Sequence, residues 1–240
     1  MNEEPKTPEG EGVVVAAEPS GGAESRVVPL DVSGRSISVS VHGHGRCAVI
    51  LGPGAGGTRQ TAQLLRVAAS LDPEGYTTIL FNFPYQEVRR KFPDKADVCE
   101  RTIAGVADYA RTSLGVTRVV LGGRSMGGRM ASQAAAHGLA CDGLVFLAYP
   151  LHPPGEEQKL RDAHLSSIRV PMLFLQGTRD EFARLDLLKI TVERLGSMAE
   201  LALFEGADHS FRTPRGAAAT SKQTEAAVML HLARWLDERA

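Results

Sequence analysis

The feature that most constrains the fold is a series of continuous apolar runs separated by segments with helical spacing. Consecutive apolar residues predict strands buried on both faces, which is typical of parallel sheets. Apolar residues three and four positions apart predict helices with one buried face. The runs cover 47–51, 78–83, 119–121, 144–148, 172–175 and 201–204, and the helical segments cover 64–71, 98–110, 126–137, 182–195 and 224–236. Strands that alternate with helices predict an α/β fold, with a mostly parallel central sheet and helices on both faces.

The ends of this pattern suggest how the chain is divided. Residues 1–26 mix Glu, Pro, Gly and Ser around a short apolar run, which predicts a disordered N-terminal tail. Residues 36–41 alternate polar and apolar side chains, and we expect them to form a half-buried edge strand. No linker interrupts the remainder, so 27–240 is predicted to be a single domain. The longest gap between predicted strands, 149–168, is expected to form a short lid over the carboxyl ends of the strands.

Composition excludes several classes of function. The 240 residues carry 27 Lys and Arg against 28 Asp and Glu, a net charge of -1, so nothing suggests binding to nucleic acid or to an anionic membrane. No apolar stretch reaches the roughly 18 residues that span a bilayer, and the acidic start does not resemble a secretory signal. We therefore expect a cytoplasmic monomer or homodimer. The three cysteines are far apart and predict buried thiols rather than disulfides or a metal site.

A glycine-rich turn directly follows the run 119–121. It reads Gly122-Gly123-Arg124-Ser125-Met126-Gly127-Gly128 and precedes a helical segment, so it contains G-x-S-x-G between a strand and a helix. In this setting the serine is predicted to adopt a strained conformation with its hydroxyl exposed. The flanking positions need glycine, because a Cβ there would strike the neighbouring backbone. Ser125 is therefore the candidate nucleophile. The alternative is a glycine-rich connection in which Ser125 only caps the helix.

A nucleophilic serine needs a base to take its proton and an acid to orient that base. When the motif belongs to a hydrolase sheet, the acid and then the histidine follow the serine along the chain, each after a strand. Asp180 follows the run 172–175 and His209 follows the run 201–204, so they are the candidate acid and base. Asp186 lies in a predicted helix and is expected to be solvated, whereas Asp208 is expected to brace the histidine loop.

A second glycine-rich loop, residues 52–58, follows the run 47–51 and is called the glycine loop below. In a hydrolase such a loop supplies one backbone N–H to the oxyanion, and the residue after the nucleophile supplies the other. The predicted donors are therefore Met126 and Ala55, with Gly56 as the alternative to Ala55.

The same loop also satisfies G-x-G-x-x-G, as Gly52, Gly54 and Gly57, which is the fingerprint of dinucleotide-binding oxidoreductases. That function needs an acidic residue at the end of the next strand to hold the ribose. The next run ends at Asn82-Phe83-Pro84 and contains no acid. The dinucleotide hypothesis is therefore kept only as the second alternative.

Together these motifs resemble the α/β-hydrolase superfamily over residues 35–239. More narrowly, the chain is similar to bacterial dienelactone-hydrolase-like proteins and to the testis-expressed α/β-hydrolase-like proteins. The resemblance implies a catalytic triad on Ser125, Asp180 and His209 and no cofactor. The glycine loop departs from many esterases by having Pro53-Gly54 in place of His-Gly. The motifs that carry the resemblance are Phe81-Asn82-Phe83-Pro84-Tyr85, Gly123 to Arg129, Tyr149 to Gly155, Gln176 to Asp180 and Asp208 to Phe211.

The resulting hypothesis is a serine hydrolase that cleaves a small ester or thioester through an acyl-enzyme. The first alternative is a weakly active or non-catalytic interaction protein built on the same fold, because some relatives have lost the serine. Arg124, Arg179 and Arg212 lie near the triad in sequence and raise the hypothesis of an anionic substrate. The residues predicted to contact substrate are Arg124, His152, Tyr149 and Phe83.

Overall fold

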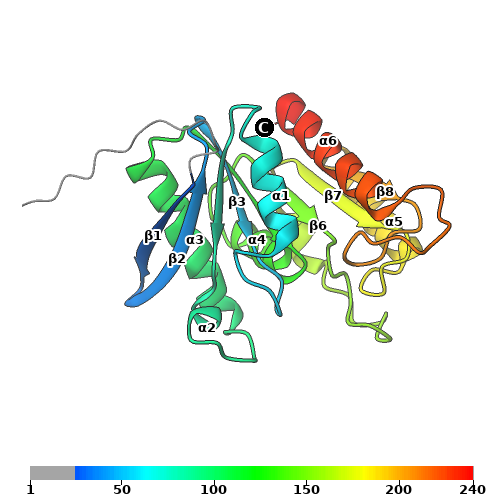
Figure 1. Ribbon diagram of the computed structural model, residues 1–240. Coiled ribbons are helices and arrows are strands. Elements are labelled where there is room, and N and C mark those ends of the chain that lie inside the picture. Colours follow the sequence, from blue (N-terminus) through cyan, green and yellow to red (C-terminus); the bar gives the residue numbers. More distant parts are fainter. Residues whose placement is uncertain (1–24, 240) are drawn as a thin grey trace, which may run out of the picture.

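The computed structural model describes residues 25–239, which form one eight-stranded sheet with helices (Figure 1). The predicted disordered tail therefore lies outside the described residues, except that its last two residues begin the first strand. The strands are β1 (Ser25–Val32), β2 (Arg35–His42), β3 (Cys47–Gly52), β4 (Thr77–Phe81), β5 (Arg118–Arg124), β6 (Gly143–Leu147), β7 (Met172–Gly177) and β8 (Ala199–Phe204). The helices are α1 (Ala62–Leu71), α2 (Pro84–Glu87), α3 (Ala96–Ser113), α4 (Met126–Ala136), η1 (Ala163–Ser167), α5 (Leu185–Leu195), η2 (Gly196–Met198) and α6 (Ser221–Arg239).

The strand order is β1-β2-β4-β3-β5-β6-β7-β8. All pairs from β4 to β8 are parallel, whereas β2 runs antiparallel to both β1 and β4. The prediction that 36–41 forms an edge strand is therefore wrong, because β1 lies outside it. The missed signal is the two-residue turn Ser33-Gly34, where both residues have a positive φ, as in a tight hairpin. Pro29 conceals β1 in the sequence, yet an edge strand tolerates a proline.

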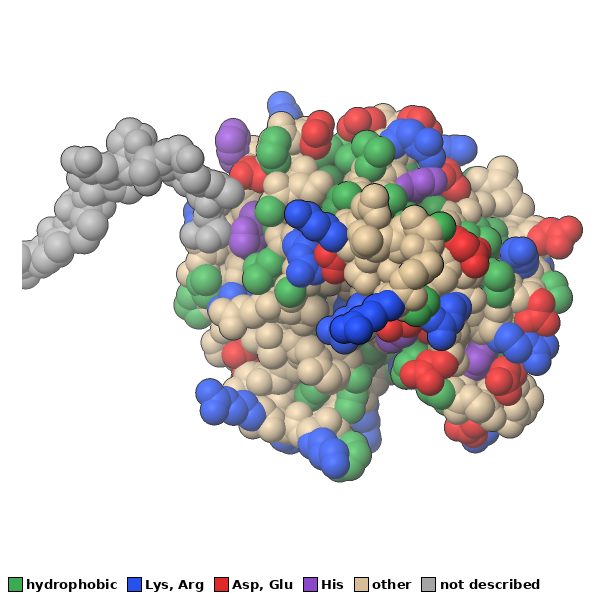
Figure 2. All heavy atoms as spheres, turned by 45° about the vertical axis from the view of Figure 1, so that its right-hand side comes forward, with side chains coloured by type: hydrophobic (Ala, Val, Ile, Leu, Met, Phe, Trp, Pro, Cys, Tyr) green, Lys and Arg blue, Asp and Glu red, His purple; other side chains and the backbone are tan. Residues whose placement is uncertain are grey.

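Helices cover both faces of the sheet. In Figure 1, α1 and α6 lie on the near face, and α3 and α4 lie behind it. The surface that Figure 2 shows carries charges of both signs, interspersed rather than gathered by sign. This agrees with the near-zero net charge of the sequence.

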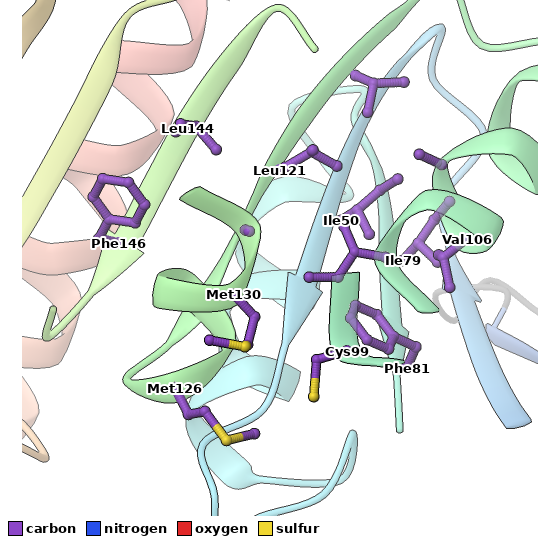
Figure 3. Packing of buried hydrophobic residues seen from close by; sticks show 14 of the residues in the cluster. Ile50, Ile79, Phe81, Cys99, Val106, Leu121, Met126, Met130, Leu144 and Phe146 are labelled. Atoms are coloured by element: carbon purple, nitrogen blue, oxygen red, sulfur yellow. The ribbon is translucent and has the colours of Figure 1, made fainter. Parts of the chain in front are cut away.

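The sheet separates two hydrophobic clusters. The central strands bury consecutive side chains because each cluster receives every second one. Figure 3 shows part of the cluster under α3 and α4, where Ile50, Ile79 and Leu121 meet Val106 and Met130. Each such side chain contributes about 1.5–3 kcal/mol when it leaves water. Burial of alternate side chains on each face fixes the register between neighbouring strands. The register in turn sets the positions of the loops that follow the strands.

The three cysteines are free, but only Cys99 is buried; Cys47 and Cys141 are partly exposed. Within residues 25–239, no group of three or more His, Cys, Asp or Glu side chains is arranged to hold a metal ion. The helices of that part of the chain include none that is long and apolar enough to cross a membrane.

The segment that connects β6 to β7, residues 148–171, is anchored at both ends. Tyr149 and Leu151 at its start and Leu165 and Ile168 at its end are buried in the core. Its middle part, 154–160, is largely exposed. The lid predicted for 149–168 is thus tied down at both ends, and its closure over a substrate stays a prediction.

Candidate active site

Ser125 lies at a sharp turn between β5 and α4, and its backbone has φ 51° and ψ -116°. A non-glycine residue in this region costs about 1–3 kcal/mol, so the surrounding structure must hold it there. A Cβ at Gly123 or at Gly127 would lie 2.2 or 2.1 Å from the carbonyl oxygen of Gly52. Both positions therefore require glycine. The predicted strain at Ser125 and the predicted close approach of the backbone are confirmed.

His209 follows β8 and joins Ser125 to Asp180. Its Nε2 lies 2.9 Å from Ser125 Oγ, and its Nδ1 lies 2.7 Å from Asp180 Oδ2. A carboxylate only accepts, so Nδ1–H donates to Asp180, and Nε2 is left to accept from the serine hydroxyl. The structure thus brings the three predicted residues together at the carboxyl ends of β5, β7 and β8.

Asp180 is held by more donors than the sequence suggested. Its side chain is fully buried. The backbone N–H of Phe182 donates to Oδ1 at 2.8 Å, and Nε2 of Gln176 donates to Oδ2 at 2.5 Å. Gln176 is itself buried and accepts from the backbone N–H of Tyr149 at 2.8 Å. A polar residue near the end of the otherwise apolar β7 was the available signal for this contact.

Phe182 also covers the histidine. Its ring centroid lies 4.3 Å from that of His209, with the planes tilted by 32°. No sequence signal points to this contact, because the pattern places Phe182 at the start of the predicted helical segment 182–195. Packing of the Phe182 ring against the imidazole limits the rotation of His209.

The two rival acids lie elsewhere, as expected. Asp186 is exposed and forms an ion pair with Arg184. Asp208 Oδ1 accepts from the backbone N–H groups of Ser210 and Arg212, at 2.8 and 2.9 Å, so it braces the loop that carries the histidine.

The glycine loop is held from outside by α2. The Tyr85 hydroxyl donates to the carbonyl of Ala55 at 2.7 Å, and Gln86 Nε2 donates to the carbonyl of Gly57 at 2.6 Å. The backbone N–H groups of Ala55, Gly56 and Met126 have no hydrogen-bond partner within residues 25–239. Met126 is the first residue of α4, where the helix dipole favours negative charge.

Three residues predicted to contact substrate are instead interior. Phe83 is buried between Phe81 and Tyr85. Tyr149 is buried and its hydroxyl donates to the carbonyl of Arg161 at 2.7 Å. His152 is buried, and its Nε2 accepts from the backbone N–H of Arg184 at 2.8 Å. Contacts inside the protein occupy these three side chains, so we do not assign them to substrate binding.

Arg124 lies between the Ser125 turn and the histidine loop. Its Nη2 donates to Ser210 Oγ at 2.9 Å and approaches the carbonyl oxygen of His209 at 3.4 Å. Burial lowers the pKa of this guanidinium from its usual range. Arg124 therefore braces the histidine loop, whereas Arg179 and Arg212 are exposed.

The fold and the site together define an α/β hydrolase architecture, and comparison with known proteins agrees. Residues 45–237 match the family described as "Alpha/beta hydrolase domain", so the chain belongs to that family. This confirms the predicted fold class and the resemblance drawn from the motifs.

Solved structures show the same fold at low sequence identity. A dienelactone hydrolase from Anabaena variabilis is 16% identical with a TM-score of 0.69, covering 90% of this chain and 98% of that one. An α/β serine hydrolase without lid from Xanthomonas campestris is 20% identical with a TM-score of 0.66, covering 91% and 98%. A dienelactone-hydrolase-like promiscuous phosphotriesterase from metagenomic libraries is 17% identical with a TM-score of 0.70, covering 91% and 99%. At these identities the likeness concerns the fold.

Proposed function

We propose that this protein is a serine hydrolase that cleaves a small ester or thioester through an acyl-enzyme. The observation that carries the proposal is the unbroken chain of hydrogen bonds from Ser125 Oγ through His209 to the buried Asp180. A serine hydroxyl is a weak nucleophile unless a positioned base takes its proton. Here the base is oriented by a carboxylate that has no access to water.

In the proposed reaction, His209 Nε2 takes the hydroxyl proton as Ser125 Oγ bonds to the acyl carbon. The N–H groups of Met126 and Ala55, or of Gly56 as the alternative to Ala55, stabilise the negative oxygen of the tetrahedral intermediate. The bond to the leaving oxygen or sulfur then breaks, and the leaving atom receives the proton from His209. Water attacks the acyl-enzyme by the same steps and frees the acid. Asp180 stabilises the transient imidazolium without taking its proton.

The two alternatives make different demands on the site. A dinucleotide-binding oxidoreductase needs an acid after β4, but Asn82 occupies that position and accepts from the backbone N–H of Arg59 at 2.7 Å. An interaction protein does not need the Ser125 hydroxyl to be reactive. Membership of the hydrolase family supports the catalytic proposal over the first alternative. Cytoplasmic location and a monomeric or homodimeric state stay predictions.

The proposal is tested by labelling the folded protein with a fluorophosphonate probe and locating the adduct by mass spectrometry. We expect one adduct on Ser125, none in Ser125→Ala, and an unchanged adduct in Ser166→Ala, whose exposed hydroxyl donates to the carbonyl of Ala163 in η1. Turnover of p-nitrophenyl butyrate should follow the same order. Absence of both labelling and turnover in the folded wild-type protein would contradict the proposal in favour of the interaction protein.

A further inference from the structure

Two half-buried arginines have no partner for their charge among the described residues. Arg129 lies on α4 and Arg161 lies in the β6–β7 segment, and both are half-buried. Within residues 25–239, neither side chain forms a hydrogen bond or an ion pair, and Arg129 Nε is buried without any partner. Burying a polar donor without a partner is costly unless a ligand completes the site. The motif carrying Ser125 ends at Arg129, but the proposed reaction gives this arginine no role.

A contact between Ser132 on α4 and His164 on η1 brings together the parts of the chain that carry the two arginines. Ser132 Oγ donates to the carbonyl of Arg129 at 2.8 Å and accepts from Nε2 of His164 at 2.7 Å. The Tyr149 hydroxyl donates to the carbonyl of Arg161 at 2.7 Å. Burial, and next the charge of Arg129, lowers the pKa of Arg161 from its usual range. The positive charge of Arg129 therefore acts on Arg161, and both side chains are half-buried.

Two acids in this region are already engaged by other residues. Asp162 is buried and accepts from Arg194 at 2.6 Å and from Thr191 at 3.1 Å. Glu156 forms an ion pair with Lys159. Neither carboxylate forms an ion pair with Arg129 or Arg161, so the N–H donors of the two guanidinium groups stay available.

Arg129 lies close to Ser125 along α4, one helical turn further on. Arg129 is four residues after Ser125, and its backbone N–H donates to the Ser125 carbonyl at 3.1 Å. Residues four apart share one face of a helix, and helical side chains lean toward the N-terminus. The Arg129 side chain therefore leans toward the Ser125 end of α4. Figure 2 shows the surface hollowed along its lower edge, where α2 and the β6–β7 segment stand on opposite sides in Figure 1.

We propose that Arg129 and Arg161 bind a carboxylate carried by the ester substrate, and so select anionic over neutral esters. This inference rests on the proposed function and makes it more specific. Two planar guanidinium groups can each give paired N–H donors to a carboxylate, and a partly buried setting strengthens such bonds. The exposed Arg179 and Arg212 lack that setting.

The test compares p-nitrophenyl hemisuccinate, which carries a carboxylate, with the neutral p-nitrophenyl butyrate. We expect the ratio of their kcat/KM values to fall roughly 10- to 100-fold in Arg129→Gln and in Arg161→Gln, as for the loss of a charged hydrogen bond. The matched control is Arg212→Gln, which removes an exposed positive charge near His209 and should change the ratio by about two-fold or less. An unchanged ratio in both variants, or an equal fall in the control, would overturn the proposal.

A binding measurement keeps this test independent of turnover. Succinate, but not succinamide, should raise the thermal unfolding midpoint of the wild-type protein, and the shift should be lost in either variant. If Arg129→Gln does not fold, the binding measurement is made on Arg161→Gln alone. That substitution is expected to disturb folding less, because Arg161 lies outside the helices and strands. A shift with inorganic phosphate and none with succinate would overturn the carboxylate assignment. Succinate binding without any turnover would contradict the proposed hydrolase and leave the anion site supported.

Discussion

Two parts of the molecule differ in how their polar groups are satisfied: the histidine side, with Asp180 and His209, and the arginine side, with Arg129 and Arg161. On the histidine side, the buried Asp180 accepts from Gln176, Phe182 and His209. On the arginine side, Arg129 and Arg161 have no partner within the described residues, although their neighbours Ser132 and Tyr149 do. Burial differs as well: the Asp180 side chain is fully buried, whereas Arg129 and Arg161 are half-buried.

This difference separates two tasks. Groups that must be in place before a substrate arrives find their partners inside the protein, because preorganised dipoles and charges need no rearrangement during the reaction. Groups that recognise a substrate must keep donors free for it, and this costs stability in the empty protein. The histidine side is therefore expected to control kcat, and the arginine side to control the choice of substrate.

The largest expected effect comes from breaking the histidine side. Asp180→Asn should lower kcat/KM for p-nitrophenyl butyrate by about 10³- to 10⁴-fold, because an amide favours the wrong tautomer of His209 and no longer stabilises the imidazolium. Asp186→Asn is the control, since that carboxylate is exposed and forms an ion pair with Arg184, away from His209. An Asp180→Asn protein that keeps its activity would mean that another group acts as the acid.

A smaller loss of activity is expected from Gln176, which contacts Asp180 rather than His209 or Ser125. Gln176→Leu removes a donor to Asp180 and should lower kcat about 10-fold with little change in KM, because the carboxylate is then less firmly held. Thr191→Val is the matched control: it removes a buried donor to Asp162, on the arginine side. The control should lose stability in urea unfolding without losing kcat. Equal losses of kcat in both variants would reduce Gln176 to a structural role.

What could be predicted from the sequence follows the same division. The strands that carry Ser125, Asp180 and His209 were found because continuous apolar runs are a strong signal and the polar residues stand directly after them. The contacts of Gln176 and of Phe182 cannot be predicted in this way, because they depend on how neighbouring loops pack against each other. Tyr149 was misplaced for a related reason: a residue after a strand end can turn into the core as readily as into a cleft.

The smallest expected effect tests the charge on the arginine side through His164. Burial, and next the charge of Arg129, lowers the pKa of this histidine below 6.5. The unfolded chain therefore takes up this proton first as the pH falls, so His164 supports stability above pH 6.5 and reduces it below. Arg129→Gln should raise the pKa of His164 toward that of the unfolded chain, and bound succinate should raise it in the wild-type protein. Both shifts can be followed by NMR titration of the imidazole, with Arg212→Gln as the control. A pKa that Arg129→Gln leaves unchanged would mean that burial alone sets it, and that the field of the two arginines is already neutralised without a ligand.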